Sequence, residues 1–225
     1  MHDATLVFDL DGTLIDTAPD LAAATNHVMA RLGLAAVDER DIRPWVGHGA
    51  LKMIEQAARA HGRILTEPEL YDLFEIFILY YSDHIAVSSR PYDGVIAALD
   101  GFMADGAALA VCTNKLERHA RQVICELGLA KYFTVITGRD SLGVYKPDPG
   151  HLTGTIALAG GKPERAVMIG DSETDIKTAK AARIPVVAVT FGYSVEPVAT
   201  FAPDVTIDHY SELSASVGRL LNRPA

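Results

Sequence analysis

Short apolar runs alternate with helix-like patterns through most of the 225-residue chain, and this alternation constrains the fold more than any other feature. Strands are expected at residues 5–9, 107–113, 133–137, 165–171, 185–190 and 204–208. Helices are expected at residues 93–105, 116–127, 150–159, 173–183 and 211–222. Several strand segments are almost continuously apolar, which is typical of parallel strands covered by helices on both faces. The sequence therefore predicts an α/β fold with a doubly wound, Rossmann-like parallel sheet.

Residues 17–89 break this alternation, because they contain helical patterns and no convincing strand. Helices are expected there at about residues 19–33, 49–61 and 70–81. In the last of these, apolar residues recur at helical spacing on one face, and we expect that stripe to pack in a core. The chain is therefore predicted to have an α/β core, residues 1–16 and 90–225, and an inserted all-helical module, residues 17–89.

The formal net charge of −9 and the pI near 5.3 argue against a nucleic-acid-binding surface, which requires a basic patch. They do not exclude an anionic substrate, since a local site can be positive in an acidic protein. The N-terminal apolar run lacks preceding basic residues, and no apolar run approaches the ~20 residues that span a bilayer. We therefore expect a cytoplasmic protein with no membrane partner. Cys112 and Cys125 are expected to be ordinary buried thiols.

Two carboxylates, Asp9 and Asp11, follow the apolar run "LVF" with one residue between them. Residues i and i+2 of a strand point to the same side, so both side chains can face one site at the carboxyl end of the strand. Two carboxylates this close raise the pKa of one of them, and a bound divalent cation removes that conflict. A D-x-D pair alone is more often a solvated turn, but the preceding apolar run favours a site.

Polar residues also follow the next two expected strands. Thr113 and Asn114 precede the helix expected at 116–127, where they could bind an anion at the helix N-terminus or cap the helix. Lys146 precedes a proline, which favours an extended conformation. A lysine held in this way can neutralise a phosphate and a carboxylate, although a lone "KP" is more often a surface turn.

The fourth segment, "VMIGDSETDI", repeats the opening pattern with Asp171 and Asp175 after an apolar strand. Both could flank a cation, and the alternative is that Asp171 caps the following helix. Four successive strand ends or the loops that follow them thus carry D-x-D-G-T, T-N, K-P and G-D-x-x-x-D. This order resembles the haloacid dehalogenase superfamily, and the resemblance covers the whole core.

The resemblance implies a phosphoryl-transfer mechanism for these residues. Asp9 would be the nucleophile that forms an aspartyl-phosphate. Asp11 would be the general acid for the leaving oxygen and then the base that activates water. Thr113 and the Asn114 backbone would bind the phosphoryl oxygens, and Lys146 would balance the charge on Asp9 and the phosphate.

The resemblance also implies a Mg²⁺ cofactor. The Asp9 carboxylate, the Asp11 backbone carbonyl and Asp171 would bind the ion, and Asp175 would support it directly or through water. Mg²⁺ prefers oxygen ligands and keeps several waters, which suits so few protein ligands.

The substrate is expected to be a small phosphorylated metabolite. The superfamily's dehalogenases and phosphonatases lack an acid at the position of Asp11, so the resemblance implies a phosphatase. The helical insert resembles the superfamily's C1 cap, which selects substrate. "FDLDGTLIDTAPDL", "RPWVGHGA", "TNK", "YKPDP" and "FGYSVEPVATFAPDVTIDHYSEL" resemble the phosphoglycolate phosphatase branch and imply 2-phosphoglycolate as substrate. Gly47, His48 and Gly49 are then expected near the substrate, and Lys115 near its carboxylate.

Other functions remain open at this point. A pyrophosphatase or a broad sugar-phosphate phosphatase would use the same residues. A β-phosphoglucomutase is disfavoured by Thr13, where that family usually has valine. A non-catalytic interaction module with this fold is disfavoured because every expected catalytic position is filled. The sequence is compatible with a monomer or a homodimer.

Overall fold

The computed structural model describes residues 1–222 of the chain. The chain divides into two compact units. One, the core unit, contains residues 1–15 and the chain from Pro91 onward, and the other, the helical unit, contains residues 16–90. Where the chain passes between the units, β2 (Ile15–Asp16) and β3 (Arg90–Pro91) pair as a two-stranded sheet.

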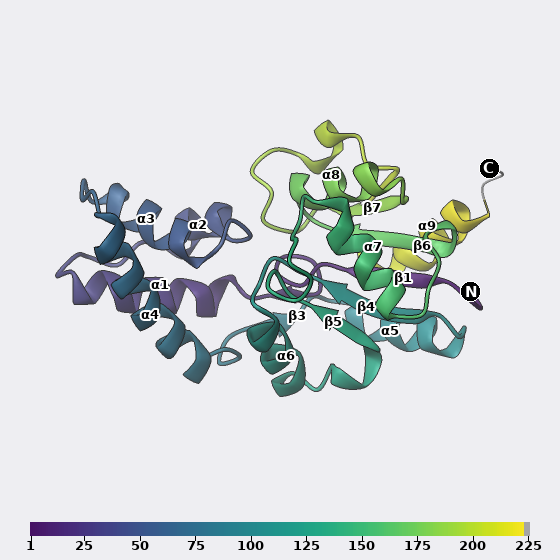
Figure 1. Cartoon of the computed structure of the whole chain (residues 1–225), viewed down its shortest axis with the longest axis horizontal. Helices are drawn as coiled ribbons and strands as arrows, with labels where there is room; N and C mark the ends of the chain where they lie inside the picture. Colours follow the sequence, from purple (N-terminus) through teal and green to yellow (C-terminus); the bar gives the residue numbers. More distant parts are fainter. Residues whose placement is uncertain (223–225) are drawn as a thin grey trace. The chain divides into compact units, whose positions relative to one another are not determined.

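The core unit is built on six parallel strands in the order β5-β4-β1-β6-β7-β8 (Figure 1). The strands are β1 (Thr5–Phe8), β4 (Ala108–Cys112), β5 (Val135–Thr137), β6 (Ala166–Gly170), β7 (Val186–Val189) and β8 (Val205–Ile207). Each lies within a segment that the apolar runs predicted. The predicted doubly wound α/β fold is therefore confirmed.

Helices pack on this sheet and bury its apolar side chains. The α-helices are α5 (Val95–Ala104), α6 (Glu117–Glu126), α7 (Pro149–Leu158), α8 (Glu173–Ala182) and α9 (Leu213–Leu221). Helices α7 and α8 share a buried cluster with the alternate strand residues Val7, Ala110 and Met168. Helices α5 and α9 pack on each other and on the sheet, and α6 packs beside β5.

Short 3₁₀ helices complete the connections of the core unit. They are η2 (Ala130–Tyr132), η3 (Pro163–Arg165), η4 (Val198–Phe201) and η5 (Tyr210–Glu212). The predicted burial of both thiols is wrong for Cys125, which is exposed, whereas Cys112 is buried. On α6 the buried positions are His119, Ala120, Val123 and Ile124. Cys125 follows this stripe on the outer side of the helix.

The topology fixes where a site can form. From β1 the chain continues to β4 and β5 on one side, and it later continues to β6, β7 and β8 on the other side. The sheet order therefore reverses at β1, and open α/β sheets bind ligands at the carboxyl ends of strands next to such a point. Phe8 pairs with Val111 and with Ile169, so β1, β4 and β6 end at nearly the same level.

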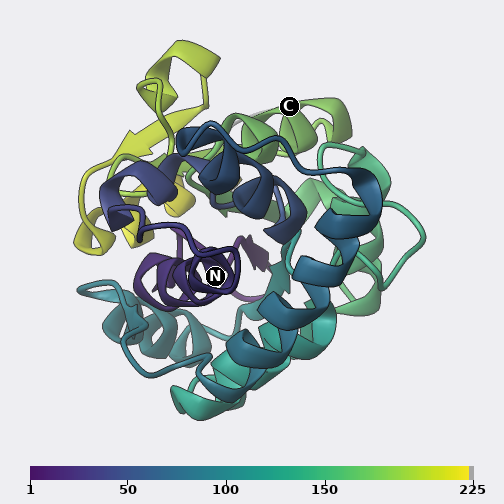
Figure 2. The same cartoon turned by 90° about the vertical axis from the view of Figure 1, so that its left-hand side faces the viewer.

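The helical unit consists of α1 (Ala18–Arg31), α2 (Glu39–Ile42), η1 (Arg43–Trp45), α3 (Ala50–Ala60) and α4 (Glu67–Asp83). Helices α1, α3 and α4 pack on one another, and Figure 2 shows them in purple and blue. The apolar stripe of α4 is buried at Leu73, Phe77, Ile78 and Tyr81, as the periodicity predicted. The sequence did not predict α2 and η1, because a single turn has no recurring face. Within residues 1–222, no helix has both the length and the apolarity to cross a membrane.

Candidate active site

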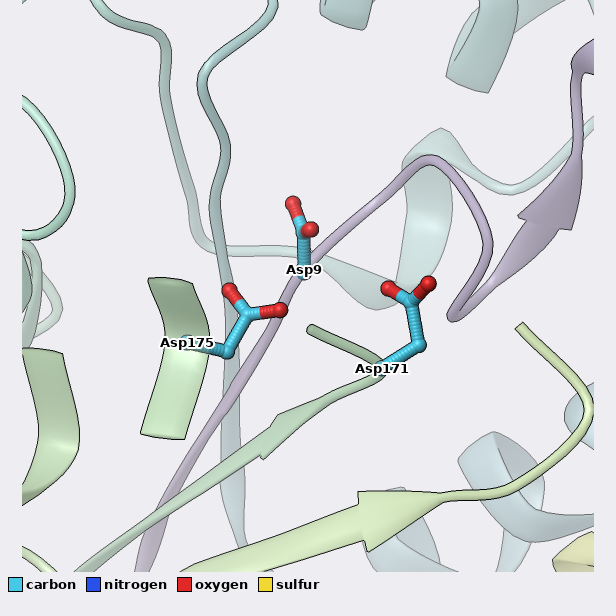
Figure 3. A group of neighbouring side chains, drawn as sticks. All are labelled: Asp9, Asp171 and Asp175. Carbon is cyan, nitrogen blue, oxygen red and sulfur yellow. The ribbon is translucent and has the colours of Figure 1, made fainter. Parts of the chain in front are cut away.

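Three carboxylates meet at the carboxyl edge of the sheet. Asp9 follows β1, Asp171 follows β6, and Asp175 lies in the first turn of α8. One oxygen of each lies within 4.8 Å of one oxygen of the other two. Figure 3 shows the three carboxylates projecting to the same side of the strand ends. The geometry therefore joins residues that are up to 166 positions apart in the sequence.

Lys146 neutralises part of this charge. Its side chain is 2% exposed, and its Nζ lies 2.6 Å from Asp175 Oδ1 and 2.9 Å from Asp9 Oδ1. Although burial lowers the pKa of this ammonium, Asp175 and Asp9 raise it overall. Lys146 therefore stays charged at neutral pH, and the alternative of a surface lysine in a turn is wrong.

One lysine does not balance three carboxylates. Burial, followed by the charges of neighbouring carboxylates, raises the pKa of Asp9 to about 7, although Lys146 opposes the shift. Burial and the charges of Asp175 and Asp9 raise the pKa of Asp171 to about 8. A divalent cation among these oxygens would remove the repulsion, and oxygen ligands of this kind suit Mg²⁺. The donor set therefore fits a magnesium site.

Asp171 is held by two residues that the sequence did not predict as its partners. Thr13 Oγ1 donates a hydrogen bond of 2.9 Å to Asp171 Oδ1, and the backbone N–H of Tyr193 donates one of 2.8 Å to Oδ2. A Cβ atom at Gly12 or Gly192 would collide with this carboxylate. The orientation of the Asp171 carboxylate thus depends on the backbone at Gly12 and Gly192 lying close to it. The "GT" after Asp11 and the "FGY" at 191–193 are the local signals that could have indicated these residues.

Asp175 has two structural partners besides the other carboxylates. Its Oδ1 accepts from Lys146, and its Oδ2 accepts from the backbone N–H and the hydroxyl of Ser172, at 3.1 and 2.6 Å. The Ser172 N–H contact, together with the Asp175 backbone N–H that donates to Ser172 Oγ at 3.3 Å, forms a capping box at the start of α8. Ser172 is therefore the N-cap, and the alternative that Asp171 caps this helix is wrong. Asp175 couples the helix start to Lys146.

Thr113 and Asn114 follow β4 beside these carboxylates. Thr113 is buried, and its Oγ1 accepts from the Lys115 backbone N–H at 3.2 Å. Asn114 Nδ2 donates to the Lys146 carbonyl at 3.0 Å, which ties two of the four motifs together. The N-cap position of α6 is Leu116, so neither Thr113 nor Asn114 caps that helix.

Asp11 is directed toward a different partner from Asp9. Its Oδ1 lies 2.8 Å from Lys115 Nζ, and the two side chains are 10% and 7% exposed. The Asp11 carboxylate is not part of the group of three acidic side chains. The edge therefore carries two charge clusters, one around Lys146 and one formed by Asp11 and Lys115.

A family profile described as haloacid dehalogenase-like hydrolase matches residues 6–189, which include the carboxylates and lysines of this site. The chain belongs to this family.

The hydrolase is similar to several bacterial proteins along its whole length. It is 50% identical over 225 residues to a phosphoglycolate phosphatase of Mesorhizobium japonicum, covering 100% of this chain and 99% of that protein. It is 44% identical over 211 residues to a phosphoglycolate phosphatase of Agrobacterium fabrum, covering 94% of this chain and 91% of the relative. The predicted superfamily and branch are therefore confirmed, as is the prediction of a phosphatase of this family.

A solved structure supports the same assignment. It is described as a predicted phosphoglycolate phosphatase from Haemophilus somnus 129pt. It superimposes on the hydrolase with a TM-score of 0.89 and 30% identity, covering 95% of this chain and 97% of that one.

The residues expected near the substrate from the helical unit lie in one loop. Gly47, His48 and Gly49 connect η1 to α3, and Gly49 is the residue before the first turn of α3. Both glycines have positive φ, 88° and 93°, a conformation that favours glycine. Their role toward a substrate of the hydrolase stays a prediction.

Proposed function

We propose that the hydrolase is a Mg²⁺-dependent phosphomonoesterase that acts through an aspartyl-phosphate on Asp9, with 2-phosphoglycolate as its substrate. The observation that carries the proposal is the Asp9 carboxylate at the sheet edge, 2.9 Å from buried Lys146 and next to Asp171 and Asp175. The names of the similar proteins from Mesorhizobium japonicum and Agrobacterium fabrum support the substrate.

Contacts at one carboxylate oxygen orient Asp9 for attack through the other oxygen. Its Oδ1 interacts with Lys146 and accepts a 2.7 Å hydrogen bond from the Leu10 backbone N–H. In the proposal the other oxygen, Oδ2, attacks phosphorus. The Oδ2–P bond forms while the bond from phosphorus to the ester oxygen breaks, and the electron pair goes to the leaving oxygen. Asp11 donates a proton to that oxygen, so the first product leaves as an alcohol.

The second half of the reaction, hydrolysis of the aspartyl-phosphate, returns the enzyme to its starting state. Asp11, now a carboxylate, takes a proton from a water molecule whose oxygen attacks phosphorus. The bond between phosphorus and Asp9 Oδ2 breaks, its electron pair stays on Oδ2, and inorganic phosphate leaves. The Asp9 carboxylate is thereby regenerated. The Asp11 carboxyl group thus serves as acid and then as base, which leaves no net change in its proton count.

Three groups bind the phosphoryl oxygens in this proposal. The Thr113 hydroxyl and the Asn114 backbone N–H donate hydrogen bonds, and Lys146 supplies a positive charge. The hydrogen bond that Asn114 Nδ2 donates to the Lys146 carbonyl fixes the lysine backbone relative to the proposed phosphate site. Preorganised donors of this kind stabilise the charge that develops during transfer without moving during the reaction.

The magnesium ion would be held by the Asp9 and Asp171 carboxylates and the Asp11 backbone carbonyl. When bound, it offsets the negative charge of the phosphate and of the carboxylates around it. Thr13 and the Tyr193 backbone orient Asp171 for this role. Asp175 contributes through its contacts with Lys146 and Ser172 and supports the site electrostatically.

Substrate choice is assigned to the helical unit. We propose that it acts as a cap, with Gly47, His48 and Gly49 in the loop that approaches the substrate. The resemblance of this insert to the C1 cap supports the cap role. The two positive-φ glycines, which give the loop its shape, support it as well.

The test is initial-rate phosphate release with Mg²⁺ from 2-phosphoglycolate, pyrophosphate and several sugar phosphates. The proposal predicts a kcat/KM for 2-phosphoglycolate well above all the others, and no release after Mg²⁺ is removed with a chelator. Comparable low rates on every substrate would keep the phosphatase chemistry and contradict the assigned substrate. Release that is unaffected by the chelator would contradict the metal assignment.

A further inference from the structure

The contact between Lys115 and Asp11 is not explained by the roles assigned so far. The resemblance to known phosphatases places Lys115 near a substrate carboxylate, yet its ammonium lies 2.8 Å from Asp11 Oδ1. Both side chains are almost completely buried, so the pair is only weakly screened by solvent. A buried ion pair of this kind orients both partners, because moving either one leaves the other charge uncompensated.

The backbone around Lys115 is fixed by close packing. Its N–H donates to Thr113 Oγ1, and its carbonyl accepts from the Arg139 N–H at 3.0 Å. A Cβ atom at Gly138 would lie 2.6 Å from the Lys115 carbonyl oxygen, so only glycine permits this approach. The lysine therefore extends toward Asp11 from a rigid base.

Asp11, in contrast, lies in a tight turn after β1. The Leu14 N–H donates to the Leu10 carbonyl at 3.0 Å, and the Gly12 N–H donates to the Ile15 carbonyl at 3.0 Å. These bonds fix the turn backbone but not the side-chain torsion angles of Asp11. Lys115 contacts this carboxylate from the end of β4 and so constrains its position.

We propose that Lys115 is a positioning residue for Asp11: its ammonium holds the carboxyl group of the general acid in place beside the leaving oxygen. This inference rests on the proposed function. It assigns the charge of Lys115 to the proton-transfer step and not to recognition of a substrate carboxylate.

Loss of Lys115 should affect different substrates depending on whether the lysine positions Asp11 or binds a substrate carboxylate. An alkoxide leaving group needs a proton as the ester bond breaks, whereas p-nitrophenolate is stable enough to leave without one. The value of kcat/KM reports steps up to the first irreversible one, here transfer to Asp9, so slow hydrolysis of the aspartyl-phosphate does not affect it. A carboxylate on the substrate changes the effect of Lys115 on kcat/KM only if Lys115 binds that carboxylate.

The experiment measures kcat/KM with Mg²⁺ for 2-phosphoglycolate, for 2-hydroxyethyl phosphate, which lacks the carboxylate, and for p-nitrophenyl phosphate. The variants are Lys115→Met and Lys115→Arg, with Lys131→Met as the control at an exposed lysine of the same unit. Folding is checked by circular dichroism and thermal unfolding.

The proposal predicts that Lys115→Met lowers kcat/KM by about 10²-fold on both alkyl phosphates and by less than about fivefold on p-nitrophenyl phosphate. Lys115→Arg should recover part of the loss on both alkyl phosphates, because it keeps the cation. Lys131→Met should match the wild type on all three.

Two results would overturn the proposal. A loss confined to 2-phosphoglycolate would make Lys115 the contact for the substrate carboxylate. An equal loss on all three substrates would assign it to phosphate binding or to the fold. Failure of the proposed function is distinguishable from both, because the wild type would then release no phosphate from any of the three.

Discussion

Lys146 lies between two carboxylates that would otherwise repel each other. It contacts Asp9 and Asp175, and its backbone is tied to Asn114. The sequence predicted a lysine near the proposed nucleophile, Asp9, from the K-P motif and the resemblance. It did not predict the contact with Asp175, which is 29 positions away and depends on how α8 begins.

Lys146→Met should therefore cost both activity and stability. Removing the cation leaves buried carboxylates without their partner, and breaking such a pair costs about 3 kcal/mol or more. We expect the free energy of unfolding, measured by urea denaturation without Mg²⁺, to fall by about this amount and phosphate release to be lost. Lys146→Met combined with Asp175→Asn should recover stability but not activity. A stability within about 1 kcal/mol of the wild type for the single variant would contradict this account of the cluster.

Thr13 offers a narrower test of the proposed metal site, because it contacts Asp171 through one hydroxyl. Groups that orient a ligand typically change metal affinity 10–100-fold when removed. Thr13→Ala should weaken the apparent Mg²⁺ affinity by about tenfold, measured by titration of activity or by calorimetry. Thr13→Ser keeps the hydroxyl and serves as the matched control. Equal Mg²⁺ affinities for the two variants would show that this hydrogen bond does not orient a metal ligand.

The strands and helices were predictable to different degrees. The apolar runs located all six strands of the large sheet, because strands buried on both faces leave a continuous signal. Helix α2 has four residues and leaves no such signal. The contacts of Asp171 with Thr13 and Tyr193 were also missed, since they join the loops after β1, β6 and β7 and have no local period. The four motifs marked the strand ends, and packing between elements supplied the supporting residues.

Helix α7 carries a buried imidazole that links stability to pH. Burial, together with the Lys146 charge, lowers the pKa of His151 to about 4. The unfolded chain binds a proton at this residue below its ordinary pKa of about 6.5, whereas the folded chain does so only near 4. The stability contribution is therefore complete above about 6.5 and is lost as the pH falls toward 4.

His151→Asn should accordingly flatten the pH dependence of stability. We expect the difference in unfolding free energy between pH 8 and pH 5 to be smaller than in the wild type by about 1–2 kcal/mol. Urea denaturation at the two pH values measures it. His61→Asn, at an exposed histidine, is the control and should leave the difference unchanged. The same pH dependence in His151→Asn and wild type would contradict a neutral buried imidazole.

The whole molecule combines an α/β core unit with a helical unit inserted after the first strand. The core unit contains Asp9, Asp11, Lys146 and Asp171, so the proposed chemistry depends on one sheet edge. At this edge Lys146 and Lys115 pair with carboxylates and offset only part of their negative charge, so the proposed Mg²⁺ would supply the remaining positive charge. The sequence indicated that an acidic protein could act on an anion, and the structure identifies the two buried lysines at that edge.

Asp9→Asn tests whether Asp9 is the nucleophile of the proposed reaction. The amide keeps the size of the side chain but cannot form the aspartyl-phosphate. Phosphate release from 2-phosphoglycolate with Mg²⁺ should fall by at least about 10³-fold with the circular dichroism spectrum unchanged. Asp105→Asn, at an exposed aspartate of the core unit, should match the wild type. A folded Asp9→Asn protein within tenfold of the wild-type rate, with its mass showing no deamidation, would contradict the account.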